Sequence, residues 1–95
     1  MYRFVVKIVM QPGTLPIAMA AAPAFTRDTL AEPGCLEFGL YANFDGSDSF
    51  VVLEAFENHA VHQAHEASEH FRKFMATARQ YFVSGKSETI VDDEA

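Results

Sequence analysis

Apolar residues occupy every second position from Tyr2 to Met10, and the positions between them hold Arg3, Val5, Lys7 and Val9. A period of two is typical of a β-strand that turns one face to a core. Two later stretches, 35–44 and 50–57, are also rich in β-branched and aromatic residues, and the sequence Asp-Gly-Ser-Asp-Ser between them has the composition of a hairpin loop. We therefore predict three strands here, the last two of which pair antiparallel.

Helical signals lie between the first two of these strands. Thr14 followed by Leu15-Pro16 predicts a helix that begins with a hydroxyl cap and runs toward Ala31. Pro23 lies inside this Ala-rich stretch and removes one backbone donor, so we expect a kink or a break there. The sequence Glu-Pro-Gly at 32–34 ends the helix, because the residue before proline leaves the α region and glycine allows a sharp reversal.

The second half of the chain predicts two more helices and a final strand. Asn58 is a cap for a short helix that ends near Ala67, and Ser68 is a cap for another. This second helix carries apolar residues near helical spacing, namely Phe71, Phe74, Met75, Ala78, Tyr81 and Phe82. Ser84-Gly85-Lys86 predicts its end, and 87–91 is the expected last strand.

The resulting order of elements is β-α-β-β-α-β. This order predicts an α+β, ferredoxin-like fold, in which a four-stranded antiparallel sheet carries its helices on one face. The other face would hold Val5 and Val9, and neither register of the 50–57 strand is purely polar. Burial of such a face stabilises at roughly 25 cal/mol per Å2, and a second copy of the chain is the simplest cover, so we expect a homodimer formed through this face. A monomer with a partly apolar exposed sheet is the alternative.

Composition limits the protein further. The 95 residues allow one domain, 1–95, and we expect its acidic tail, 92–95, to be disordered. The single cysteine, Cys35, excludes an intrachain disulfide framework and suits a reducing, cytoplasmic compartment. No signal peptide or membrane-spanning stretch is visible. A formal charge of −6 without a basic cluster argues against nucleic acid as a partner.

Several short motifs follow one another in a particular order and spacing. They are Pro12-Gly13 after the first strand, Glu32-Pro33-Gly34-Cys35, the pair Glu54 and Phe56, and Ala64-His65 followed by Ser68, His70 and Phe71. In this order and spacing they resemble the antibiotic biosynthesis monooxygenase (ABM) domain family, from Tyr2 to about Val91. The resemblance implies a ferredoxin-like subunit and a dimeric α/β barrel.

The resemblance does not select one reaction. The family includes cofactor-free oxygenases of quinol- and anthrone-like compounds, haem-degrading relatives and an isomerase of a small sugar-like signal. Glu69 stands where the family usually has proline, and it suits the N-terminal end of a helix equally well. Pro23 is a second departure, which would reshape one side of the pocket.

His65 is the main candidate for catalysis. Its neutral imidazole, placed on the short helix above the apolar sheet face, would take a proton from a phenol or enol. The substrate anion would then transfer an electron to dioxygen, the co-substrate, while the protein supplies orientation and a dry cavity, so we expect no cofactor. The alternative is a structural histidine that stabilises the 64–68 turn through hydrogen bonds.

Glu54 is a second candidate, flanked by Leu53 and Ala55 in a strand. A carboxylate buried there would need hydrogen bonds or a cation. If Glu54 is catalytic, it would orient a histidine. The more common role of such a residue is to pair across a dimer or to cap a loop. Tyr41 and Tyr81 could each donate a hydrogen bond to a substrate oxygen, or simply pack.

Four histidines and Glu66 lie close together in the sequence, at His59, His62, His65 and His70. Their spacing matches no His-Glu zinc motif, and we interpret them as one pocket histidine among solvated ones, without a metal. Haem degradation is disfavoured, because that branch of the family relies on a pocket tryptophan and an asparagine. This chain has no tryptophan, and its first strand has no asparagine.

The substrate-binding side chains are expected among the apolar residues of the sheet and the last helix. Besides Tyr41, the candidates for a cavity between sheet and helices are Phe4, Val6, Phe38, Phe71, Phe74 and Met75. The alternative is that these side chains fill the core completely. Three functions therefore remain open: a cofactor-independent monooxygenase of a small aromatic or quinol-like substrate, a non-oxidative isomerase or decarboxylase that uses His65 as acid and base, and a ligand-binding protein without turnover.

Overall fold

The structure, a computed structural model, describes residues 1–91, so the predicted disorder of 92–95 lies outside the described residues. In chain order the elements are β1 (Tyr2–Met10), α1 (Leu15–Leu30), β2 (Cys35–Ala42), β3 (Ser49–Phe56), α2 (His59–Glu66), α3 (Glu69–Ala78), the 3-10 turn η1 (Arg79–Tyr81) and β4 (Phe82–Val91). The strands form one sheet in the order β2-β3-β1-β4, and every neighbouring pair is antiparallel. The predicted ferredoxin-like βαββαβ fold is confirmed.

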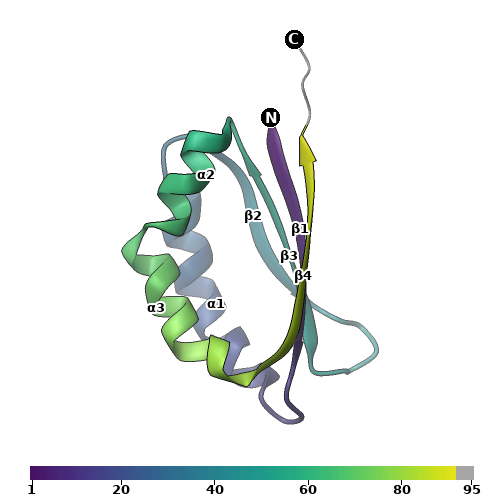
Figure 1. Ribbon diagram of the computed structural model, residues 1–95. Helices are drawn as coiled ribbons and strands as arrows, with labels where there is room; N and C mark the ends of the chain where they lie inside the picture. Colours follow the sequence, from purple (N-terminus) through teal and green to yellow (C-terminus); the bar gives the residue numbers. More distant parts are fainter. Residues whose placement is uncertain (92–95) are drawn as a thin grey trace.

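All three helices cover the same face of the sheet (Figure 1). The predicted inner face of β1 is buried at Phe4, Ile8 and Met10. From α1 the residues that reach the core recur at helical spacing, namely Ala18, Ala22, Phe25 and Thr29. None of the helices within residues 1–91 is both long and apolar enough to cross a membrane.

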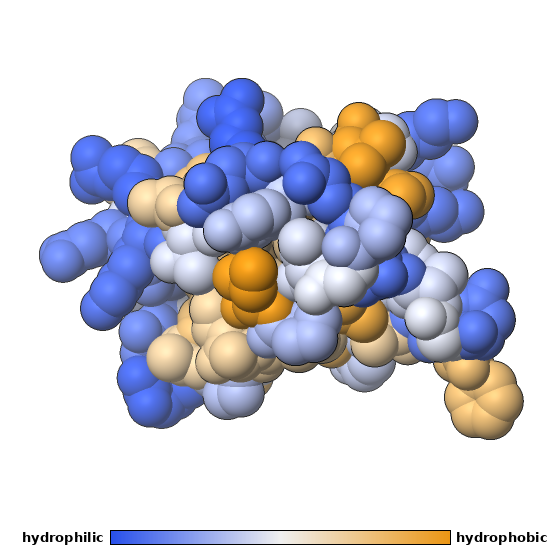
Figure 2. Space-filling view, turned by 90° about the horizontal axis from the view of Figure 1, so that it is seen from below, coloured by the Kyte–Doolittle hydropathy of each residue, from blue (hydrophilic) through white to orange (hydrophobic). Residues whose placement is uncertain are grey.

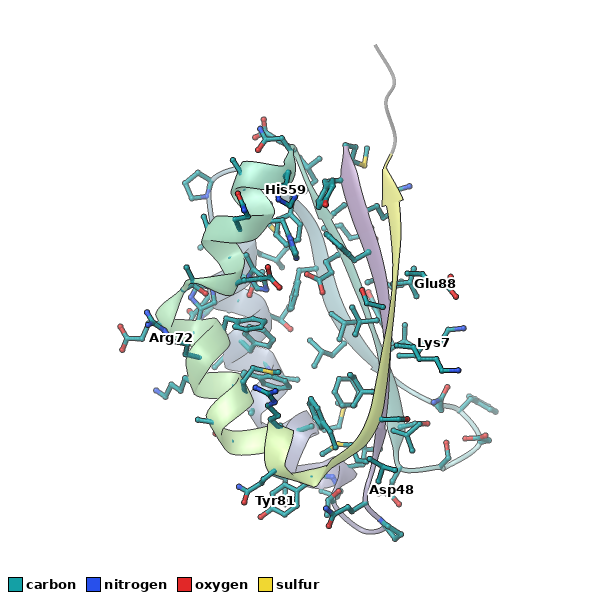
Figure 3. The ribbon with its side chains drawn as sticks, viewed as in Figure 1. Lys7, Asp48, His59, Arg72, Tyr81 and Glu88 are labelled. Atoms are coloured by element: carbon teal, nitrogen blue, oxygen red, sulfur yellow. The ribbon has the colours of Figure 1, made fainter. Side chains whose placement is uncertain are left out.

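Within residues 1–91, the opposite face of the sheet carries no helix. Lys7 and Glu88 point away from the helices on this side (Figure 3). Between such charged residues the centre of the face is apolar, because Val5 lies directly opposite Leu53 in the β1–β3 ladder. Apolar side chains also reach the surface at the end of the molecule shown in Figure 2, in patches between polar ones.

Two predictions about α1, a break at Pro23 and a cap by the Thr14 hydroxyl, were wrong. The helix is continuous through Pro23, because this residue lies on the exposed side and the buried residues around it hold the helix against the sheet. Thr14 is the residue before the helix, but its hydroxyl donates to the carbonyl of Gln11 and caps nothing. Instead, Asp48 from the β2–β3 loop accepts a hydrogen bond from the backbone N–H of Leu15, with an Oδ1 to N distance of 3.2 Å.

The expected break at Ser84-Gly85-Lys86 was also wrong. These residues lie inside β4, which begins at Phe82 and pairs with β1 along its length. Gly85 lies opposite Ile8, and a Cβ atom at Gly85 would be 3.1 Å from the Cδ1 atom of Ile8. Long-range pairing with β1 therefore outweighs the local turn preference of a Ser-Gly-Lys sequence.

Candidate functional site

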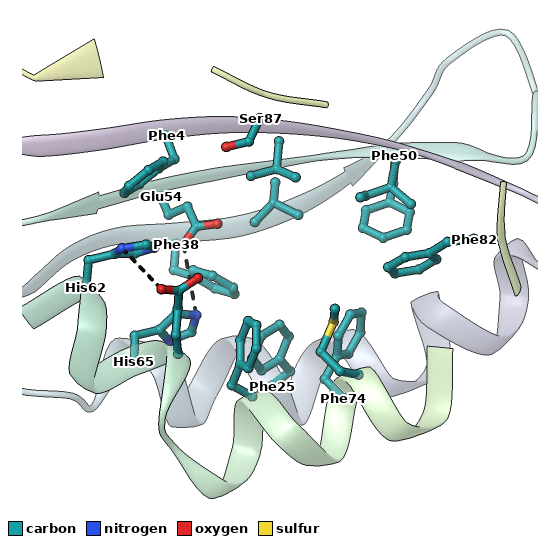
Figure 4. Close-up of a pocket in the computed structure, with 16 residues that line it drawn as sticks. Phe4, Phe25, Phe38, Phe50, Glu54, His62, His65, Phe74, Phe82 and Ser87 are labelled. Carbon is teal, nitrogen blue, oxygen red and sulfur yellow. Dashed lines mark ion pairs between the residues drawn. The ribbon is translucent and has the colours of Figure 1, made fainter. Parts of the chain in front are cut away.

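A cavity of about 270 Å3 lies between the sheet and the helices. Six predicted cavity residues line it, namely Phe4, Val6, Phe38, Phe71, Phe74 and Met75, and both His65 and Glu54 border it as well. Figure 4 shows aromatic rings along most of its length and a polar group of side chains at one end. These residues therefore do not fill the core completely, and space for a small ligand remains among them.

His65 lies in the last turn of α2, at the polar end of the cavity. Its side chain is only 2% exposed, although imidazole is usually found partly in water. The Nδ1 atom is 2.9 Å from Oε2 of Glu32, and the carboxylate accepts the hydrogen bond from Nδ1–H. The Nε2 atom is therefore left unprotonated in the neutral ring, and it points toward Glu54 in the cavity.

Local capping places His65. Asn58 accepts a hydrogen bond from the backbone N–H of Val61, and Ser68 accepts one from that of Phe71, so both predicted caps are confirmed. The Ser68 hydroxyl also donates to the carbonyl of His65, at 2.6 Å. The turn between α2 and α3 is thus held on both sides, which fixes the backbone at His65.

Glu32, in the turn after α1, also contacts a second histidine. Its Oε2 atom accepts a hydrogen bond from Nε2 of His70, at the start of α3. Neither Glu32 nor His70 lines the cavity, so both lie behind His65 as seen from it. Sequence reasoning included both residues in a family motif, gave Glu32 no role and interpreted His70 as a solvated histidine. The latter was wrong, because the His70 side chain is only 21% exposed and pairs with Glu32.

Glu54 reaches the cavity from β3. It is 8% exposed, and its Oε1 atom has no hydrogen-bond partner within the described residues. The same atom is 4.0 Å from Nε2 of His65. Burial, supported by the charges of Glu66 and Glu32, raises the pKa of this carboxyl to about 7. Near neutral pH it therefore exists as a mixture of acid and carboxylate.

The interpretation of His62 as a solvated residue was wrong. Its ring stacks on Phe4 with centroids 4.1 Å apart, and its side chain is 13% exposed. Its Nδ1 atom is 3.7 Å from Oε1 of Glu66, and both residues border the cavity. A helix period of four from His62 to Glu66 was visible in the sequence, but the side of α2 that meets the sheet was not.

Burial also lowers the pKa of both cavity histidines. For His65 this effect outweighs the hydrogen bond and the charge of Glu32, which act in the opposite direction. For His62 it outweighs the charge of Glu66. His65 is therefore a neutral imidazole at neutral pH, which is the state that accepts a proton. Burial raises the pKa of the Cys35 thiol to about 11, so a thiolate nucleophile is not available there.

The assignment of Tyr41 to the cavity was wrong. Tyr41 alternates with Phe38 and Leu40 along β2 and therefore lies on the outer face of the sheet, 54% exposed, with its ring over Gly39. Tyr81 packs against the core at the end of the molecule where α3 meets β4, and it is not among the residues that line the cavity.

Sequence comparison identifies the family. The family model described as antibiotic biosynthesis monooxygenase matches residues 1–77. The chain belongs to this family. No curated protein matches the chain.

Several solved structures have the same fold. A protein from Nitrosomonas europaea that is assigned by name to the antibiotic biosynthesis monooxygenases has a TM-score of 0.91 at 19% identity, over 98% of this chain and 99% of that one. A protein of unknown function from Bacteroides thetaiotaomicron, described as a possible oxidoreductase, has a TM-score of 0.84 at 25% identity, over 94% of each chain. A conserved protein from Methanosarcina mazei has a TM-score of 0.87 at 19% identity, over 97% of this chain and 92% of that one.

Sequence reasoning missed the remaining residues that line the cavity of this ABM domain. They are Ile8, Phe25, Phe50, Val52, Phe82 and Ser87. Placing Glu54 in a pocket would have identified Phe50 and Val52, because residues two and four positions away in a strand share a face. Phe25 lines the cavity from α1, and its ring stacks on that of Phe74 with centroids 4.4 Å apart. The sequence signal for its inward position was its spacing of seven residues from Ala18, which lies on the same face of the helix.

Proposed function

We propose that this ABM protein is a monooxygenase that oxidises a small aromatic, quinol-like substrate with dioxygen and without a cofactor. The observation that supports this most directly is the position of His65, whose free Nε2 atom faces a cavity lined mostly by apolar side chains. Phenylalanine rings would hold a flat ring by stacking, and the polar end would receive its hydroxyl group. The cavity volume suits a ligand of one or two rings.

The reaction begins with transfer of a proton. A substrate hydroxyl donates its proton to Nε2 of His65, and the Glu32 carboxylate at Nδ1 stabilises the imidazolium that forms. The substrate anion then reduces dioxygen by electron transfer within the dry cavity. The substrate supplies all four electrons that reduce dioxygen, so one oxygen atom enters it and the other leaves as water: AH2 + O2 gives AO + H2O.

Oxygen uptake with a panel of hydroquinones and polyphenols tests this function. His65→Ala is expected to lower the rate by about 10^2 to 10^4-fold, the usual range for loss of a general base. His59→Ala is the matched control, since His59 lies on the same helix but is exposed and outside the cavity lining. With 18O2, one labelled atom per product is expected. The function is contradicted if no quinol consumes oxygen above autoxidation, or if His65→Ala retains the wild-type rate.

Glu54 supports an alternative reaction. A carboxyl group with a pKa of about 7 beside a neutral imidazole forms an acid and base pair of the kind that isomerases and decarboxylases use. Conversion of a substrate without oxygen uptake would favour this alternative. However, the described residues that line the cavity include no lysine or arginine to bind a strongly anionic metabolite.

We also propose that the protein acts as a homodimer in the cytoplasm. The outer sheet face, with Val5 opposite Leu53 and Val9 45% exposed, offers an apolar centre between charged residues. A second copy packed there would leave the cavity on the helix side accessible to substrate. The free thiol of Cys35 suits a reducing compartment.

A further inference from the structure

Three potential metal ligands converge on the side of His65 that faces away from the cavity. They are Oε2 of Glu32, Nδ1 of His65 and Nε2 of His70, and all three atoms lie within 4.8 Å of one another. Each comes from a different segment, namely the turn after α1, the last turn of α2 and the first turn of α3. The proposed reaction gives no role to His70, although its side chain is mostly buried.

We propose that Glu32, His65 and His70 form a binding site for a divalent cation of the zinc type. Two imidazole nitrogens and one carboxylate oxygen are a ligand set that zinc uses in proteins, with a fourth position left for water. In the structure the carboxylate oxygen accepts hydrogen bonds from both rings. A cation at the same point would replace these two protons, with small outward shifts of the three side chains.

The position of Glu54 supports this site independently. Histidines that bind a metal through one ring nitrogen usually donate the other N–H to a carboxylate. A cation on Nδ1 of His65 would leave the ring proton on Nε2, which is 4.0 Å from Oε1 of Glu54. That oxygen is buried and has no hydrogen-bond partner within the described residues. Cation binding would therefore give Glu54 the donor that it lacks.

The charge around the site also favours a cation. Three carboxylates surround His65, namely Glu32, Glu54 and Glu66. Arg27 and Lys73 lie along a groove on the other side of His70, and Arg27 is exposed and pairs with Asp28. Because exposed charges are screened by water, the largely buried carboxylates of Glu32 and Glu54 have the larger effect at the site.

The location of the site determines what a bound cation would do. Glu32 and His70 do not line the cavity, so a cation between them would not contact a substrate there. It would act through His65, because coordination of Nδ1 leaves Nε2 protonated and unable to accept a proton. The cation would thus inhibit the reaction. This inhibition rests on the proposed function, whereas the binding of the cation does not.

Titration calorimetry of the full chain with ZnCl2 tests the site, after removal of any affinity tag and of trace metals. We expect one zinc per chain and a rise in Tm when zinc is added. His70→Gln and Glu32→Gln each remove a ligand and are expected to weaken zinc binding at least about 100-fold. Glu54→Gln removes an outer carboxylate and should show the smaller loss that is typical of such a residue, about 10- to 100-fold. His59→Gln and Cys35→Ser should bind zinc like the wild type.

Three results would overturn the site. They are the absence of both heat and a Tm shift with zinc, unchanged affinity in His70→Gln, and loss of binding in Cys35→Ser. The Tm shift of the wild type needs no variant, so a variant that fails to fold does not remove the test. No substrate is present, so a failure of the protein to oxidise quinols leaves the zinc result intact.

Discussion

Glu54 makes the stability of this protein depend on pH in a way that can be measured. Burial is the main reason that its pKa rises from 4.5 to about 7. The native state therefore binds this proton more tightly than the unfolded state, and stability falls as pH rises from about 4.5 to 7 and then levels off. A shift of this size, at 1.36 kcal/mol per pKa unit, corresponds to about 3 kcal/mol.

Glutamine has nearly the shape of the protonated carboxyl and does not titrate. We therefore expect Glu54→Gln to match the wild type in free energy of unfolding near pH 4.5 and to exceed it by about 3 kcal/mol at pH 8. The gain arises because the wild type must bury a charged carboxylate whose Oε1 atom has no hydrogen-bond partner among residues 1–91. A charge-removing change at a solvated site should give no such gain.

Urea unfolding from pH 4.5 to 8, at fixed protein concentration and ionic strength, measures this difference. The lowered pKa of His65 has the opposite effect, because stability increases as pH rises toward 6.5, but at pH 8 His65 is neutral in both the folded and the unfolded state and does not affect the comparison there. Glu37→Gln is the matched control, since Glu37 is exposed on the neighbouring strand. Equal stability of Glu54→Gln and wild type at pH 8 would refute the reasoning.

Two further predictions concern the fold and the assembly. Asp48→Ala should lower the free energy of unfolding by about 1 kcal/mol, the usual cost of a lost helix cap. Thr14→Ala should lower it by less. Urea unfolding that ranks the two variants in the reverse order would contradict the assignment of the cap to Asp48. Sedimentation of the wild type at micromolar concentration should give twice the 10.5 kDa subunit mass. Leu53→Glu places a charge in the centre of the outer sheet face and should give a monomer. A monomeric wild type would contradict the dimer.

The fold could be predicted because its signals are local. Alternation along β1, the caps at Asn58 and Ser68, and the turn at 32–34 all depend on residues within a few positions of one another. The errors occurred where a distant segment decided the outcome. Pairing with β1 keeps Gly85 in a strand, and Asp48 replaces the cap that Thr14 does not provide.

The site was predicted only in part for the same reason. His65, Glu54 and six apolar residues could be placed at the cavity from the sequence, because each lies on the face of a strand or helix that turns inward. Tyr41 was placed on the wrong side, although it lies three positions from Phe38 in the same strand and the two side chains must therefore point to opposite faces. Glu32 and His70 are 38 positions apart, and no local pattern shows that they meet.

The sequence by itself therefore determined the order of elements, the family and the identity of the central histidine, because periodicity, caps and motif spacing are properties of short segments. Only the tertiary structure decided which groups surround that histidine. Whether His65 is a base, a metal ligand or a structural residue depends on Glu32 at Nδ1, Glu54 near Nε2 and His70 behind them. These contacts exist because three separate segments pack around one buried point, where unsatisfied charges are costly and every partner matters.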